Sequence, residues 1–90
     1  MSKEVEFQNR DIFIQLGIAI STLRKIRGFS QEELAAEAHI SRSLLSVIEA
    51  PNIAHGFGLE TLINIARVLK VHPGDLLKTK IFPNDTINIE

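Results

Sequence analysis

One short segment, from Arg42 to Ala50, carries the side chains best suited to recognising another molecule through hydrogen bonds. Drawn as a helix at about 100° per residue, one arc of the segment has small or hydrogen-bonding side chains and a single cation. The members of this arc are Arg42, Ser43, Ser46, Val47 and Ala50. A helix that packs on one side and offers such a face on the other suits the major groove of DNA, which admits an α-helix. The spacing is equally compatible with an ordinary helical bundle whose polar arc is simply solvated.

Two short helices joined by a tight turn must position this arc. Ser30 is an N-cap candidate, and Glu33 three residues later completes a capping box at the start of the first helix. The apolar pattern breaks at His39 and Ile40, after which Ser41 offers a second N-cap. Each helix has an apolar face, formed by Leu34, Ala35 and Ala38 in the first and by Leu44, Leu45 and Ile48 in the second. The pattern therefore predicts a helix, a turn and a second helix.

Three more helices are expected around this pair. Helical spacing of apolar residues predicts helices over 11–27 and 59–70, with Asn9 or Asp11 as a cap for the first. Gly28 is a C-cap candidate because it tolerates left-handed backbone. The last helix begins near Pro73, a favourable first-turn residue. The repeating apolar positions are Ile12, Leu16, Ile20 and Leu23 in one helix, and Leu62, Ile65, Ala66 and Leu69 in the other.

The two ends of the chain have different patterns. Residues 1–10 are interpreted as a flexible arm, with one short strand around Val5 and Phe7 as an alternative. Residues 11–80 form the predicted domain, and residues 81–90 form an extension. Within this extension, Thr86–Ile89 alternates at period two, which indicates a short strand. It is interpreted either as a dimerising strand arm or as a frayed tail.

Taken together, these residues resemble the phage-repressor (Cro/cI-like, XRE) helix-turn-helix family. The specific motifs are Ser-Gln-Glu-Glu-Leu-Ala at 30–35 and Ile-Ser-Arg-Ser at 40–43. Further matching positions are Leu16, Gly17, Ile20, Leu23, Arg24, Gly28, Phe29, Ile48, Glu49, 59–62, Ile65, Ala66, Leu69 and Val71. The resemblance covers about residues 12–78. It implies an all-α, compact five-helix domain with the helix-turn-helix at helices two and three.

The resemblance also implies roles for individual residues. Base contacts would come from Arg42, in a bidentate contact with guanine, and from Ser43, Ser46 and Val47. The expected phosphate contacts are Gln31, Ser41, Lys25, Arg27 and His55, with Gln31 also orienting Arg42. Arg24 and Glu49 correspond to the family's partly buried ion pair. Solvent exposure, with a favourable helix-dipole interaction, is the alternative for the cations at the end of the first helix.

Several positions depart from the family pattern. His39 stands where the family usually has glycine, in a turn that needs positive φ, and His is one of the few other residues that accept it. Val47, Ala50 and Pro51 replace residues that are often polar or glycine. The loop over 51–58 has no Lys or Arg, although relatives commonly use one here to reach DNA phosphates. We therefore expect weak backbone anchoring and a readout that depends on few contacts.

Composition limits the classes of function. Ninety residues with 44% hydrophobic content predict one domain with a modest core. There are 10 basic and 11 acidic residues, so a net charge of −1 offers little general attraction to DNA. The sequence has no cysteine, no metal-ligand spacing among its three histidines and no phosphate-binding loop, so we expect no enzyme activity, no cofactor and no metal. No signal-peptide or membrane-spanning pattern is present, which favours the cytoplasm.

Two hypotheses about function follow. The leading one is a sequence-specific DNA-binding transcriptional regulator, most simply a repressor, that binds a near-palindromic operator as a homodimer. The alternative is a protein-interaction module, such as the antitoxin or adaptor half of a two-protein system. The near-neutral charge, the uncharged 51–58 loop and the extra apolar residues Ile14, Ile18 and Ile26 support this alternative. The two are compatible, since antitoxins of this fold often bind DNA too.

Overall fold

Helices account for the regular structure of residues 5–78, the part of the chain that the structure, a computed structural model, describes. A 3-10 turn, η1 (Phe7–Asn9), leads into α1 (Arg10–Arg27). The helices α2 (Gln31–Glu37) and α3 (Arg42–Glu49) follow, and α4 (Leu59–Leu69) and α5 (Pro73–Lys78) complete the order. The expected all-α architecture of five helices is confirmed for these residues.

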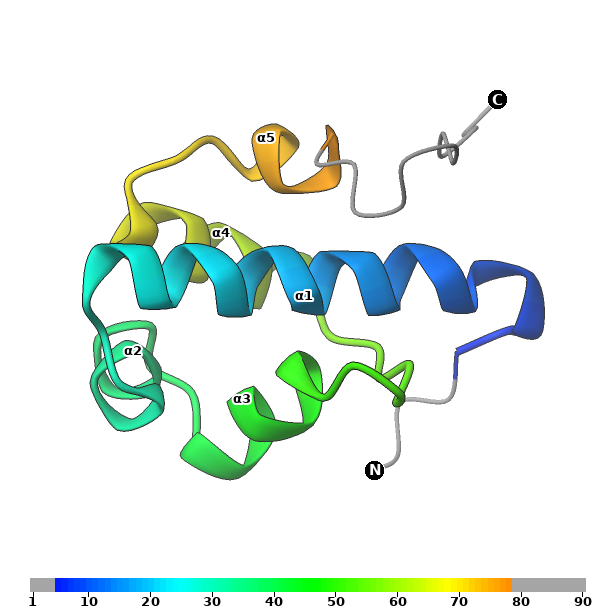
Figure 1. Ribbon diagram of the computed structural model, residues 1–90, viewed down its shortest axis with the longest axis horizontal. Coiled ribbons are helices and arrows are strands. Elements are labelled where there is room, and N and C mark those ends of the chain that lie inside the picture. Colours follow the sequence, from blue (N-terminus) through cyan, green and yellow to red (C-terminus); the bar gives the residue numbers. More distant parts are fainter. Residues whose placement is uncertain (1–4, 79–90) are drawn as a thin grey trace.

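The long helix α1 is the centre of the arrangement. It crosses the molecule with α2 and α3 on one side and α5 on the other, while α4 lies behind it (Figure 1). Helix α1 contacts α3, α4 and α5, and α2 contacts both α3 and α4. The side chains buried between these helices are Leu16, Ala19, Ile20, Leu34, Ala35, Ala38, Leu45, Ile48, Leu62, Ile65, Ala66, Leu69 and Leu76. One apolar core therefore fixes all five helices.

Local signals end and begin the helices at the expected residues. Gly28 takes φ 83° after α1, and its amide donates to the carbonyls of Arg24 and Lys25. Ser30 and Glu33 form the complete capping box, since each side chain accepts a hydrogen bond from the other residue's backbone amide, at 3.0 and 2.8 Å. Ser41 accepts the amide of Leu44 at 3.0 Å and so caps α3.

The turn between α2 and α3 contains left-handed backbone at His39, where φ is 62°. The amide of His39 donates to Ala36 at 3.3 Å, and the amide of Ile40 donates to Ala35 at 3.0 Å. These bonds close the end of α2 and turn the chain toward α3. The expectation that His39 accepts positive φ is confirmed. The imidazole-bearing Cβ makes this left-handed conformation strained.

The ends of the domain differ from the sequence-based expectation in detail. The strand suggested at Val5 and Phe7 is wrong, because Phe7–Asn9 form a 3-10 turn closed by the Asn9 amide on the Glu6 carbonyl at 2.8 Å. Helix α1 begins at Arg10, and Asn9 at its N-cap makes no side-chain capping bond. Helix α4 ends one residue early, because Lys70 takes φ 63°. Residues 1–4 of the proposed arm and the predicted strand at Thr86–Ile89 lie outside the described residues.

Candidate nucleic-acid interface

The position of α3 is set by a close crossing with α1. Gly17 lies on the buried side of α1, directly against the backbone of α3. A Cβ added at Gly17 would collide with the carbonyl oxygen of Ile48 and would lie 3.6 Å from the Cα of Glu49. Only glycine lets the two backbones approach this closely. The C-terminal half of α3 is therefore held against the middle of α1.

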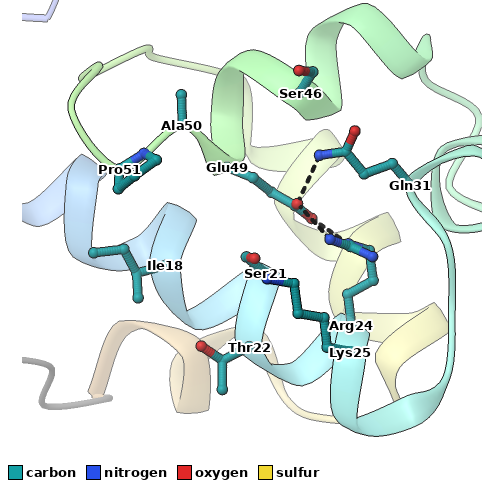
Figure 2. Close-up of a pocket in the computed structure, with 10 residues that line it drawn as sticks. All are labelled: Ile18, Ser21, Thr22, Arg24, Lys25, Gln31, Ser46, Glu49, Ala50 and Pro51. Atoms are coloured by element: carbon teal, nitrogen blue, oxygen red, sulfur yellow. Dashed lines mark hydrogen bonds and ion pairs between the residues drawn. The ribbon is translucent and has the colours of Figure 1, made fainter.

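A buried ion pair fixes the same end of α3. Arg24 Nε donates to Glu49 Oε2 at 2.8 Å, and Arg24 Nη2 donates to Glu49 Oε1 at 3.1 Å. The two side chains are only 10% and 4% exposed. The remaining Arg24 nitrogen, Nη1, donates to the carbonyl of Phe29 at 2.8 Å, and Gln31 Nε2 donates to Glu49 Oε1 at 2.9 Å (Figure 2). One carboxylate thus ties α3 to α1 and to the first residue of α2.

The opposite side of α3 faces outward. Leu45 and Ile48 are buried in the core, whereas Arg42, Ser43 and Ser46 are exposed. These three polar residues line one surface hollow of about 320 Å³. A guanidinium and two hydroxyls therefore converge on one surface, and no described residue covers them. Hydroxyl and guanidinium groups are suited to hydrogen bonding with base edges.

A second groove, of about 500 Å³, runs between α1 and α3 beside this hollow. Ser46 lies on its α3 side, while Ser21, Thr22 and Lys25 line it from α1 (Figure 2). Ile18, Arg24, Gln31, Glu49, Ala50 and Pro51 complete the lining. Because Ser46 lines both depressions, the hollow and the groove meet at α3. The groove adds one exposed cation, Lys25, to the polar groups of α3.

Several other residues expected to contact DNA lie away from the hollow, or are bonded to other parts of the domain. Gln31 bonds to Glu49, not to Arg42. Arg27 Nε donates to the carbonyl of Leu69 at 2.9 Å, so it interacts with the end of α4 on the side of α1 away from Lys25. Val47 is half-buried and does not line the hollow. His55 is half-buried in the loop before α4 and lines neither the groove nor the hollow.

Sequence reasoning missed two features of this surface. The Gly17 crossing had a signal in its glycine within an otherwise strong helix, where glycine is unfavourable by about 0.5–1 kcal/mol unless packing requires it. The groove also had a signal in the sequence, because Ser21, Thr22 and Lys25 are spaced to share a face of α1. Neither signal predicts a crossing or a groove until the position of α3 against α1 is known.

Other kinds of site are not found in the described part of the chain. Residues 5–78 contain no group of three or more His, Asp or Glu side chains placed to hold a metal ion. Within the same range, no helix has the combined length and apolar character needed to cross a membrane. The surface around α3 is therefore the strongest candidate site.

Comparison with known proteins shows the family of this fold. The family model described as a helix-turn-helix domain matches residues 17–80, which includes α2, the turn and α3. The chain belongs to the XRE-type helix-turn-helix family. It therefore has the fold of DNA-binding transcription regulators, with α2 and α3 as its helix-turn-helix. A search of curated proteins finds no match.

Solved structures of XRE-type regulators are similar to the chain. The N-terminal DNA-binding domain of SinR from Bacillus subtilis is 32% identical with a TM-score of 0.70, covering 77% of this chain and 99% of that domain. The restriction-modification controller protein C.AhdI from Aeromonas hydrophila is 27% identical with a TM-score of 0.66, covering 73% of this chain and 96% of that one. A structure of SinR, described as the master regulator for biofilm formation, in complex with DNA is 35% identical with a TM-score of 0.64, covering 69% and 97%.

Proposed function

We propose that this XRE-type protein is a sequence-specific repressor that binds a near-palindromic operator as a homodimer, with α3 in the major groove. The observation that carries the proposal is the exposed surface of Arg42, Ser43 and Ser46 on a helix whose other side is fixed in the core. Two such helices related by a two-fold axis read two half-sites about one helical turn apart. SinR, which is similar to this chain, is known in a complex with DNA.

The base contacts come from the outward residues of α3. Arg42 lies in the first turn of α3, and its guanidinium has the geometry for a bidentate contact with O6 and N7 of guanine. Ser43 and Ser46 donate to or accept from neighbouring base edges or phosphates. Val47, which is half-buried, contacts a thymine methyl group at the edge of the surface.

The phosphate contacts are few. Lys25 in the groove supplies a cation beside α3, while Gln31 and Ser41 supply polar groups at the starts of α2 and α3. His55 adds a positive charge only when it is protonated. Arg27 donates its Nε–H to the Leu69 carbonyl, so only its other guanidinium N–H groups are available to a phosphate. Because each phosphate contact releases a counterion, few contacts predict a shallow dependence of affinity on salt.

Selection of bound sequences from a random DNA pool tests the proposal. The expected result is enrichment of an inverted repeat that contains a guanine in each half-site, followed by a gel shift with that sequence at low and physiological salt. Absence of any enriched sequence, with equal binding to random DNA, would overturn the regulator assignment.

The same chain has a second candidate function, as a protein-interaction module such as the antitoxin or adaptor half of a two-protein system. The net charge of −1 and the absence of Lys and Arg over 51–58 favour this candidate, because both weaken attraction to DNA phosphates. SinR, again, is known in a complex with the protein SinI. Co-purification of a second protein, together with no gel shift at either salt concentration, would favour this candidate over the repressor.

A further inference from the structure

The outer face of α4 presents apolar side chains to solvent. Leu59 is 70% exposed and Ile63 is 39% exposed, one turn further along the same helix. The core-facing side of α4 carries Leu62, Ile65, Ala66 and Leu69. Leu59, three residues before Leu62, and Ile63 lie along one edge of that side, so the apolar stripe of α4 continues onto the exposed surface. Two adjacent apolar side chains exposed on a helix form a small patch that a second helix can cover.

Charges flank this apolar pair in a particular order. Glu60 lies in the first turn of α4 and Arg67 in the last, and both are exposed. They are seven residues apart, which is two helical turns, so they lie on the same flank of the outer face. Arg67 Nη2 donates to Asn64 Oδ1 at 2.9 Å, which holds the guanidinium along the helix. The face is thus acidic at one end, apolar beside it and basic at the other end.

This order is complementary to itself when the helix is reversed. In a parallel pair of α4 helices, the two Glu60 side chains would lie at one level and the two Arg67 side chains at another, so no Glu60 would face an Arg67. In an antiparallel pair around a two-fold axis beside Ile63 and Asn64, Glu60 of each copy faces Arg67 of the other. An isologous interface requires this kind of self-complementary patch, because the same surface is used twice.

We propose that α4 of one copy packs antiparallel on α4 of a second copy of this chain, with Ile63 at the centre of the contact and Leu59 toward each of its ends. Two Glu60–Arg67 ion pairs, one on each side of the two-fold axis, set its direction. The inference rests on the proposed homodimer and names the surface that forms it. A contact between helices of three turns is smaller than a standard stable interface, so we expect a weak dimer that the operator strengthens.

Charge reversal in two separate variants tests the contact. Glu60→Arg and Arg67→Glu should each raise the dissociation constant of the dimer at least tenfold, measured by sedimentation equilibrium without DNA. An equimolar mixture of the two variants should regain association, because each heterodimer contact then joins opposite charges. Glu37→Arg and Lys78→Glu make the same charge changes at exposed positions on other helices, and should dimerise like the wild-type chain.

Folding and DNA binding are measured on the same variants. Circular dichroism should show helix content equal to wild type, and a duplex with a single half-site should bind the variants and the wild-type chain equally. Dimerisation that Glu60→Arg leaves unchanged, a mixture no better associated than either variant alone, or a wild-type chain that stays monomeric would each overturn the contact. Dimerisation as expected, without selection of any DNA sequence, would instead refute the proposed function and leave the contact standing.

Discussion

Gly17 of α1 lies directly against the carbonyl group of Ile48 in α3, with no room for a side chain between the two helices. This contact sets how far α3 projects from the domain. Since the neighbour is backbone and cannot rotate away, Gly17→Ala must push α3 outward.

Gly17→Ala should therefore destabilise the fold by about 1–3 kcal/mol, the usual cost of overpacking a core. Thermal unfolding followed by circular dichroism measures this as a lower Tm. Gly74→Ala is the matched control, because a Cβ at Gly74 in α5 meets nothing within 4 Å. The control should stay neutral or gain up to about 1 kcal/mol from the better helix propensity of alanine. Equal unfolding temperatures for both variants would contradict the close crossing.

Removing one partner of the buried ion pair should be costly. Arg24→Ala leaves the Glu49 carboxylate buried with only Gln31 as a donor, and we expect a loss of about 3–5 kcal/mol in the free energy of unfolding. The double variant Arg24→Met/Glu49→Leu removes both charges and should lose less than Arg24→Ala alone. Urea unfolding of the three proteins decides this, and a double variant at least as unstable as the single one would show that the charge left behind is not the cause.

Relief of the strained turn should stabilise the protein. His39 takes φ 62°, where an L-residue costs roughly 1–2 kcal/mol, and glycine does not have this cost. Glycine also loses more entropy on folding, so we expect His39→Gly to gain about 0.5–1 kcal/mol. Ala36→Gly, within α2, should instead lose about 1 kcal/mol. A lower Tm for His39→Gly would mean that the imidazole makes a stabilising contact.

Base readout is tested through Arg42. Arg42→Ala should weaken binding to the selected operator by about 1–3 kcal/mol and relax the preference at one base position in each half-site. Lys78→Ala, which removes the same charge at the end of α5, should leave the preference intact. An equal loss on operator and random DNA would show that Arg42 contacts only phosphate.

The two cations at the end of α1 should behave differently. Lys25 lines the groove beside Ser46, so Lys25→Ala should weaken binding to all sequences and reduce the slope of log affinity against log salt by about 1. Arg27 interacts with the Leu69 carbonyl, so Arg27→Ala should lower Tm and change the slope little. Salt titrations of DNA binding with the two variants distinguish these roles, and equal slopes would contradict the phosphate contact proposed for Lys25.

Local chemistry explains which parts of the fold could be predicted. The cap at Ser30, the turn at His39 and the end of α1 at Gly28 each depend on residues within one turn, so the sequence contains the whole interaction. The start of α1 was less predictable, because Asn9 makes no capping bond and nothing local marks the boundary.

The site was predictable in kind but not in extent. The outward arc of α3 follows from helical periodicity, and its polar residues are exposed as that periodicity requires. The difference between Lys25 and Arg27 does not follow, because both are basic residues of one helix end. They are two residues apart and so point to opposite sides of α1, and only the packing of α3 and α4 shows what lies on each side.

Helix α3 has one side that packs in the core and another that is exposed, and this separation has a consequence for changing the specificity of the protein. The residues that hold the helix, Leu45, Ile48 and Glu49, are buried, whereas Arg42, Ser43 and Ser46 are exposed and lie outside the buried core. Substitutions at the three exposed positions can therefore change the surface of α3 without changing the packing of the core. A combinatorial library at these three positions should consist largely of folded proteins, from which new operator preferences can be recovered directly.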